Sequence, residues 1–131
     1  MPAPHRSARS PEECDHLLGE YLAAGDLDAI VDLYEPSACF ITQTREVHVG
    51  HDGIRTAFAD FAASKPRLRE HIVQALRNGN DLVVLYNDWT LSVAGPDGQP
   101  IEMSGKAIET VRRQPDGSWR FAIDDPFGRG L

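Results

Sequence analysis

The sequence contains few of the residues on which metal, redox or nucleotide chemistry depends. It has two cysteines in 131 residues, and it contains no CxxC pair, no HExxH motif and no glycine-rich phosphate loop. We therefore expect no metal and no cofactor. Cys14 and Cys39 fall in a predicted helix and a predicted strand, where we expect two buried thiols rather than a disulfide.

Basic residues and long apolar runs are also scarce. The 13 Lys and Arg residues are outnumbered by 20 Asp and Glu residues, and the net charge is −7. A nucleic-acid partner is not expected, because binding phosphates requires a basic face. No apolar run reaches the roughly 20 residues of a membrane helix, and the amino terminus lacks the apolar core of a signal peptide. We therefore expect a cytoplasmic protein with no membrane partner.

One domain is predicted over residues 10–131, because a chain of this length suits a single hydrophobic core. Residues 1–9 show no periodicity and are predicted to be a flexible tail. Ser10-Pro11-Glu12-Glu13 has the pattern of a capping box, and an apolar stripe at helical spacing follows it as far as Leu22. Helices are predicted between 11 and 25, between 26 and 36 and between 52 and 65.

The second half of the chain is predicted to be mainly β-structure. Turn-forming clusters of Pro, Asp and Gly at 95–98 and 114–117 separate runs in which apolar and polar side chains alternate. Strands are predicted over 38–44, 69–77, 82–93, 103–113 and 119–125. In the last three strands the odd-numbered positions carry most apolar side chains and are predicted to face inward, whereas the inward face of 38–44 stays open. This order predicts an α+β domain whose helices cover one face of a curved sheet.

Three polar residues interrupt the predicted inward face: Asn87, Glu109 and Asp125. A buried amide or carboxylate is costly unless it is hydrogen-bonded or opens into a polar cavity, so we expect this face to line a pocket as well as a core. Burial raises the pKa of a carboxylate, which makes Glu109 a candidate general acid or base. Glu109 could equally be a structural carboxylate paired with an arginine, and Asp124-Asp125-Pro126 also has the composition of a turn.

A set of motifs resembles the nuclear transport factor 2-like superfamily. In the first half they are Tyr21-Leu22-Ala23-Ala24-Gly25-Asp26-Leu27-Asp28, Leu33-Tyr34 and Gly50-x-x-x-Ile54-Arg55-x-x-Phe58. In the second half they are 88–91, 104–107, 111–113, 116–120 and 123–128. Over residues 10–128 the sequence is most similar to the SnoaL-like and ketosteroid isomerase-like bacterial proteins of that superfamily.

The resemblance implies a cone-shaped roll, in which a strongly bent sheet wraps a long first helix, leaves a pocket, and dimerises through the sheet. Ketosteroid isomerase uses a carboxylate base, a tyrosine and a protonated acid. The position of the base falls at Thr42 and that of the tyrosine near Leu18, so only Glu109 has a counterpart. Threonine cannot abstract a carbon-bound proton at neutral pH. True ketosteroid isomerase activity is therefore not expected.

The sequence thus predicts a cavity for a small-molecule ligand, with Glu109 and Asp125 as candidate catalytic residues for proton transfer on a hydrophobic carbonyl or cyclic compound. The residues predicted to line it are Leu18, Thr42, Phe58, Asn87, Trp89 and Ile123. The alternative is a non-catalytic homodimer that binds a ligand or serves assembly. Tyr86 and Ile108 on the opposite face of the sheet favour a homodimer in either case.

Overall fold

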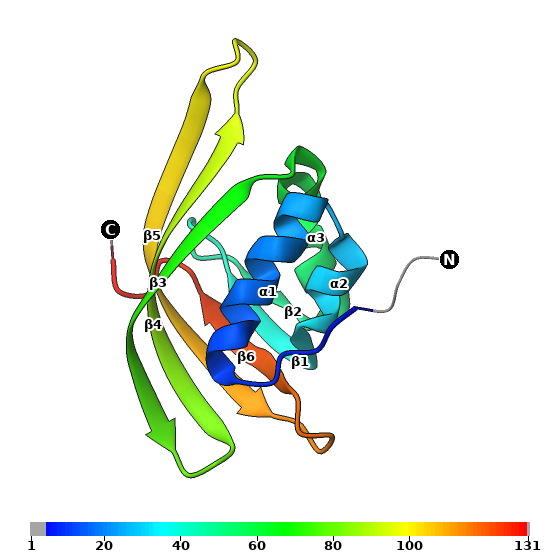
Figure 1. Ribbon diagram of the computed structural model, residues 1–131, viewed down its shortest axis with the longest axis vertical. Helices are drawn as coiled ribbons and strands as arrows, with labels where there is room; N and C mark the ends of the chain where they lie inside the picture. The colour runs from blue at the N-terminus through cyan, green and yellow to red at the C-terminus, as the bar shows by residue number, and fades with distance from the viewer. Residues whose placement is uncertain (1–4, 131) are drawn as a thin grey trace.

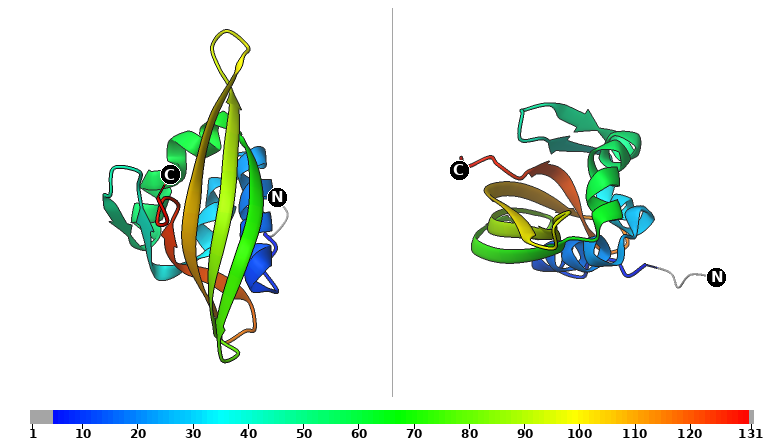
Figure 2. Two further views of the ribbon diagram at one scale, coloured as in Figure 1. Left: turned by 90° about the vertical axis from the view of Figure 1, so that its left-hand side faces the viewer. Right: turned by 90° about the horizontal axis from the view of Figure 1, so that it is seen from above.

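The computed structural model describes residues 5–130. Its helices are α1 (Pro11–Ala24), α2 (Leu27–Asp32) and α3 (Gly50–Ser64). Its strands are β1 (Tyr34–Ile41), β2 (Val47–Val49), β3 (Arg67–Asn78), β4 (Leu82–Ala94), β5 (Pro100–Arg113) and β6 (Trp119–Asp125). Figures 1 and 2 show the long strands β3, β4 and β5 bending around the side on which the three helices lie.

The six strands form one mixed sheet in the order β2-β1-β6-β5-β4-β3. β1 and β6 pair in parallel, and the other neighbours pair antiparallel. The predicted α+β roll, with three helices packed on a curved sheet, is confirmed. Among residues 5–130, none of the helices is long and apolar enough to cross a membrane.

The helix ends follow the local signals in the sequence. The Ser10 hydroxyl accepts a hydrogen bond from the Glu13 backbone N–H at 3.2 Å, and the Asp26 carboxylate accepts one from the Ala29 N–H at 3.1 Å. Gly25 ends α1 with φ of 70°, a left-handed conformation that glycine adopts without steric strain. These caps fix the two ends of α1, which lies across the concave side of the sheet (Figure 1).

The segment before α1 differs from the predicted flexible tail. Residues 1–4 lie outside the described range, but Ala8 is fully buried and its carbonyl accepts a hydrogen bond from the Trp119 N–H at 2.9 Å. The Tyr21 hydroxyl donates to the Arg6 carbonyl at 2.7 Å. Residues 5–9 are therefore part of the packed domain.

The end of β6 corrects the predicted inward face. Val111 pairs with Phe121 and Thr110 with Ile123, so Ala122 is an extra residue on the β6 side of the ladder. Such a bulge moves every later side chain to the opposite face. Asp124 is consequently buried, whereas Ile123 is 45% exposed.

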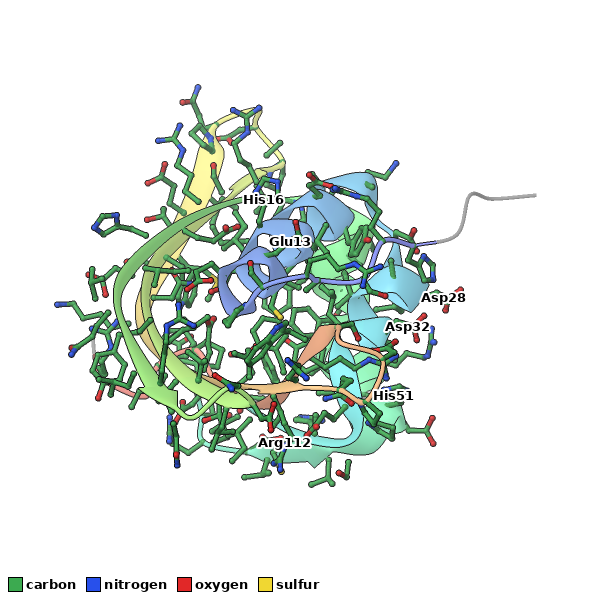
Figure 3. All side chains as sticks on the ribbon, turned by 60° about the horizontal axis from the view of Figure 1, so that its bottom comes forward. Glu13, His16, Asp28, Asp32, His51 and Arg112 are labelled. Atoms are coloured by element: carbon green, nitrogen blue, oxygen red, sulfur yellow. The ribbon has the colours of Figure 1, made fainter. Side chains whose placement is uncertain are left out.

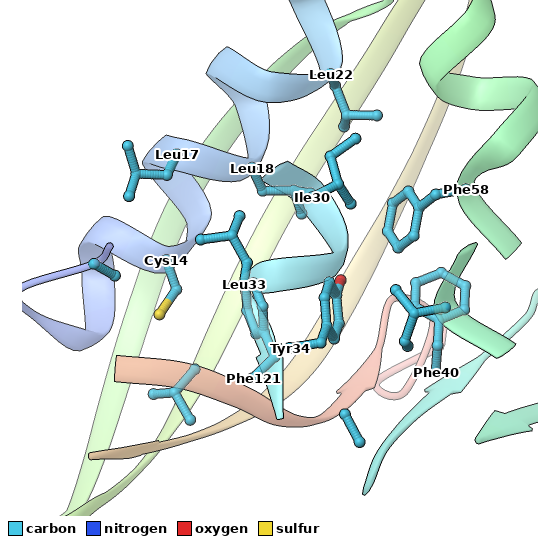
Figure 4. Packing of buried hydrophobic residues seen from close by; sticks show 14 of the residues in the cluster. Cys14, Leu17, Leu18, Leu22, Ile30, Leu33, Tyr34, Phe40, Phe58 and Phe121 are labelled. Atoms are coloured by element: carbon cyan, nitrogen blue, oxygen red, sulfur yellow. The ribbon is translucent and has the colours of Figure 1, made fainter. Parts of the chain in front are cut away.

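Apolar side chains of the three helices and of β1 pack against those of β4, β5 and β6 in one core, part of which is shown in Figure 4. Tyr34, at the start of β1, lies between two phenylalanines, with ring centroids 4.8 Å from Phe121 and 5.8 Å from Phe58. Each such fully buried side chain contributes about 1.5–3 kcal/mol by leaving water. Beside this core, a cavity lies between the inner face of the sheet, α1 and α3.

Candidate functional site

The cavity has a volume of about 310 Å³ and lies between the inner face of the sheet, α1 and α3. Its walls are mainly apolar and aromatic, formed by Leu18, Leu22, Phe40, Ala57, Phe58, Phe61, Leu68, Trp89, Leu91, Met103, Pro126 and Phe127. The loop after β1 also lines it, and the exposed Gln43 and Thr44 mark the side open to solvent. This size and lining suit a small hydrophobic molecule.

Three carboxyl side chains line the buried part of the cavity: Asp15 of α1, Glu109 of β5 and Asp124 of β6. We call them the acid cluster. Their residues are 1%, 4% and 2% exposed, respectively. Other acids of the chain, such as Asp28 and Asp32, lie at the periphery of the molecule (Figure 3). The acid cluster is therefore a distinct feature of the interior.

Neighbouring polar groups orient the acid cluster. The Asn87 amide donates to Glu109 Oε2 at 3.4 Å, and its own oxygen accepts from the His71 N–H at 3.0 Å, which fixes the direction of the amide. The Tyr34 hydroxyl donates to Asp124 Oδ2. Strand alternation brings Asn87 and Glu109 to the same face, and the bulge in β6 adds Asp124 to them.

Burial keeps protons on the acid cluster near neutral pH. Loss of hydration raises the pKa of Asp15 and of Asp124 to about 7. Burial also raises the pKa of Glu109 well above its ordinary value, and the nearby charge of Asp15 raises it further. Two ionised carboxylates would only repel each other, whereas one shared proton lets Asp15 and Glu109 form a hydrogen bond. The pair is therefore suited to hold and release a proton.

A fourth carboxyl group lies just outside the cavity. Glu70 of β3 packs against α1 beside Gly19, where a Cβ atom would lie 2.6 Å from Glu70 Oε1. Burial, followed by the charge of Asp15, raises the pKa of Glu70 to about 7. Glu12 on α1 adds a further negative charge near Asp15. Asp15 is thus surrounded by acids from α1, β3, β5 and β6.

Four oxygens of the acid cluster have no hydrogen-bond partner among residues 5–130: both of Asp15, Oε1 of Glu109 and Oδ1 of Asp124. A shared proton between Asp15 and Glu109 uses one oxygen of each. The remaining acceptors belong to side chains that line the cavity. Buried polar atoms are seldom left without a partner, so these acceptors point to a function.

Five of the predicted lining residues, namely Leu18, Thr42, Phe58, Asn87 and Trp89, line the cavity together with Glu109. Ile123 does not line it, because the bulge turns its side chain to the outer face. Asp125 does not line it either, and its carboxylate binds Arg45 through two hydrogen bonds of 2.9 and 3.0 Å. The adjacent Asp124 takes the place in the site that the alternation predicted for Asp125.

Sequence reasoning missed Asp15, Tyr34 and Asp124. Asp15 had a recognisable signal, because it lies three residues before Leu18 and seven before Leu22, on the apolar side of α1. Tyr34 falls within the helix predicted between 26 and 36, but it is the first residue of β1. Asp124 had no signal in the sequence, since the bulge that turns it inward depends on the pairing with β5.

Trp89 is held in the wall of the cavity by a close approach of the backbone. Its indole N–H donates to the Pro126 carbonyl at 2.8 Å. Gly105 is its partner in the register, and a Cβ atom there would lie 2.6 Å from the indole and 2.7 Å from the Pro126 oxygen. Glycine at 105 therefore makes this position of Trp89 possible.

Residues 5–130 contain no group of three or more His, Cys, Asp and Glu side chains arranged to hold a metal ion. His51, one of the histidines in the sequence, donates to the Tyr34 carbonyl at 2.8 Å. The acid cluster presents its acceptors to a cavity whose walls are mainly apolar.

A bent sheet around a first helix, with a cavity between them, defines a cone-shaped domain of the nuclear transport factor 2-like class. Residues 17–122 match the family model of the SnoaL-like domain. The chain therefore belongs to the SnoaL-like family. A search of the curated proteins found no match.

Solved structures of similar fold come from several bacteria. A protein from Xanthomonas campestris named as a calcium/calmodulin-dependent protein kinase II association domain is 19% identical, with 97% of this chain and 98% of that chain covered and a TM-score of 0.75. A ketosteroid isomerase-like protein from Erwinia carotovora is 14% identical, with coverages of 87% and 89% and a TM-score of 0.72. A cystatin-like-fold member of the class from Novosphingobium aromaticivorans is 15% identical, with coverages of 86% and 75% and a TM-score of 0.72. Similarities at this level show the fold alone.

Proposed function

We propose that the protein binds a small hydrophobic carbonyl or cyclic compound in the cavity and catalyses a proton transfer on it through Glu109. The observation that carries this proposal is the protonatable pair of Asp15 and Glu109 beside apolar walls. Catalytic acids and bases work best when their pKa lies near the working pH, and burial moves both carboxyls in that direction.

In the proposed reaction the two carboxyls have opposite roles. The protonated carboxyl of Glu109 donates its proton to the carbonyl oxygen, while the Asp15 carboxylate accepts a proton from the neighbouring carbon. The C–H bond breaks, its electron pair forms the C=C bond of the enol, and the carbonyl π-electrons form the new O–H bond. Asn87 positions Glu109 through its hydrogen bond. Return of the proton to another carbon would complete an isomerisation.

True ketosteroid isomerase activity is not part of the proposal. Thr42 lines the cavity, but its hydroxyl accepts a hydrogen bond from the Glu46 N–H at 3.0 Å, and a hydroxyl of ordinary acidity is no base for a C–H proton. Leu18 lines the cavity without a polar atom. Asp15 of α1 would have to act as the base, and Glu109 of β5 as the acid that protonates the carbonyl oxygen.

The test is hydrogen exchange at carbon, which needs no knowledge of the final product. A panel of apolar cyclic ketones is incubated with the protein in D2O, and loss of C–H signals next to the carbonyl is followed by NMR. We expect Glu109→Gln to lower the catalysed rate by about 10²–10⁴-fold, the usual contribution of a general acid or base. Glu102→Gln, an exposed substitution on the same strand, is the matched control. A Glu109→Gln protein as active as the control would contradict the role of Glu109.

We also propose that two copies of the chain associate through the outer face of the sheet. A largely apolar row across four strands supports this. Leu76 of β3 pairs with Val84 of β4, Val84 pairs with Thr110 of β5, and Thr110 pairs with Ile123 of β6. Leu76 and Ile123 are 43% and 45% exposed. Such a row suits an isologous interface. The same observation favours the alternative function, a non-catalytic assembly module, if the exchange test fails.

The dimer is tested by light scattering behind size-exclusion chromatography. Ile123→Asp places a charge at the β6 end of the row and is expected to convert a dimer into a monomer. Ile101→Asp serves as the control. It changes another exposed isoleucine, which lies near the start of β5. A native protein that is monomeric at all concentrations would refute the interface. The two free thiols are compatible with a cytoplasmic location, which we retain as a proposal.

A further inference from the structure

The acceptors of the acid cluster place a chemical requirement on the ligand. Three acids that are at least 96% buried line the cavity, and four of their oxygens have no partner among residues 5–130. No Lys, Arg or His belongs to the described lining residues. A ketone offers only an acceptor oxygen, so it satisfies one protonated acid and brings no donor to the other acceptors that have no partner. The best complement is a ligand that brings several donors and a positive charge.

The walls of the cavity suit the same ligand. Phe58, Phe61, Trp89 and Phe127 line it, in two neighbouring pairs whose ring centroids are 6.5 and 5.4 Å apart. The faces of aromatic rings attract cations, and their area removes an apolar ring system from water. An ammonium group carries three N–H donors and one positive charge. It can meet oxygens of separate carboxyls without leaving a net negative charge buried.

We propose that the ligand of this cavity is a protonated hydrophobic amine, with its ammonium group on Asp15, Glu109 and Asp124 and its ring system between the walls that carry Phe58 and Trp89. This inference rests on the proposed function, since it names the class of compound that the same cavity takes. A cyclic or carbonyl substrate would then also carry a basic nitrogen.

The experiment compares three probes with one ring system and different head groups: naphthylmethylamine, naphthylmethanol and naphthoic acid. Binding to the full chain is measured by isothermal titration calorimetry at neutral pH, and the series is repeated with the benzyl and anthracenylmethyl analogues to cover ligand size. We expect the amine to bind at least about tenfold more tightly than the alcohol of the same ring, and the carboxylate to bind more weakly than both.

Two variants separate the acid cluster from the general negative charge of the protein. Asp15→Asn and Glu109→Gln keep the shape of the side chains, and each is expected to bring the affinity for the amine down towards that for the alcohol. The affinity for the alcohol should change less than threefold. Glu102→Gln removes one exposed charge and should leave the preference intact. Thermal unfolding shows whether each variant is folded. If one of the two variants does not fold, the other still tests the proposal.

The outcomes distinguish this inference from the proposed function. An alcohol that binds as tightly as its amine overturns the amine proposal and leaves a cavity for neutral compounds, as the proposed function requires. A preference for the amine that survives in both acid variants also overturns the amine proposal, because the preference would then come from charges outside the acid cluster. If no head group on any ring system binds, both proposals fail together.

Discussion

Acidic side chains are held in opposite ways on the outside and the inside of this cone. On the outer face Asp88 pairs with Arg129 at 2.6 Å, and Asp125 pairs with Arg45 at 2.9 Å. Inside, the acid cluster has no basic residue beside it among the described lining residues of the cavity. Acids without cations in a dry interior oppose folding. In the proposed function, the outer acids serve the structure and the inner ones serve ligand chemistry.

Asp124 and Asp125 show the same contrast in adjacent residues. Asp125 has two charge-assisted hydrogen bonds to Arg45, whereas Asp124 has one hydrogen bond, from the neutral hydroxyl of Tyr34. Burial raises the pKa of Asp124 to about 7, and the charge of Asp125 adds to this rise. A one-residue bulge therefore separates a carboxylate paired with an arginine from a protonatable interior one.

Neutralising an inner acid should produce the largest effect on stability. Asp15 has a raised folded-state pKa, about 7 against 3.8 for the ordinary group. The folded protein therefore binds more protons than the unfolded chain between these values, and its stability falls as the pH rises from about 4 to 7. At one pKa unit per 1.36 kcal/mol, this amounts to about 2–4 kcal/mol.

We therefore expect Asp15→Asn to raise the free energy of unfolding at pH 8 by about 2 kcal/mol or more, and to have little effect at pH 5, where Asp15 is already protonated. Urea unfolding at the two pH values measures this. Glu102→Gln, an exposed substitution, should be neutral at both. A variant that is less stable than the native protein at pH 8 would show that Asp15 is held by a stabilising contact after all.

Removing the one protein donor of Asp124 should have an intermediate effect in the opposite direction. Tyr34→Phe keeps the ring packing but deletes the hydroxyl that donates to Asp124 Oδ2. Leaving a buried acceptor without its donor costs about 1–3 kcal/mol, and the pKa of Asp124 should rise further because the bond from Tyr34 lowers it. Tyr34→Phe should therefore lower the free energy of unfolding more at pH 8 than at pH 5.

Tyr21→Phe is the matched control for this change. The Tyr21 hydroxyl donates to the Arg6 carbonyl at 2.7 Å in an exposed position, so water can replace it. Thermal unfolding of the two variants at both pH values gives the comparison. If both variants lost the same stability at pH 5 and at pH 8, the Tyr34 hydroxyl would not interact with an ionised Asp124.

Much of this arrangement could be predicted from the sequence, and the failures have physical causes. Alternation in β4 and β5 depends on local geometry, so Asn87 and Glu109 were placed on the inner face without any knowledge of the sheet. The bulge at Ala122 arises from the pairing of two strands and has no counterpart in the pattern of β6 alone. Asp15 became part of the site because tertiary packing brings α1 against β5, and helical periodicity alone does not contain that contact.

The smallest effect is expected where the sequence predicted a catalytic residue. Asp125→Asn removes the negative charge that holds Arg45, whose side chain is 56% exposed and whose backbone φ is 70°. The Asp125 side chain is 14% exposed, but water still solvates the Arg45 guanidinium and salt screens the pair, so the ion pair contributes little.

Asp125→Asn should therefore lower the melting temperature less than Tyr34→Phe does, and high salt should remove most of the difference from the native protein. It should leave carbon-bound hydrogen exchange and amine binding unchanged, because the side chain is outside the cavity. Asp124→Asn, one residue earlier, should weaken amine binding. If Asp125→Asn reduced exchange as strongly as Glu109→Gln, the assignment of outer acids to structure and inner acids to chemistry would be wrong, and Asp125 would return to the catalytic site.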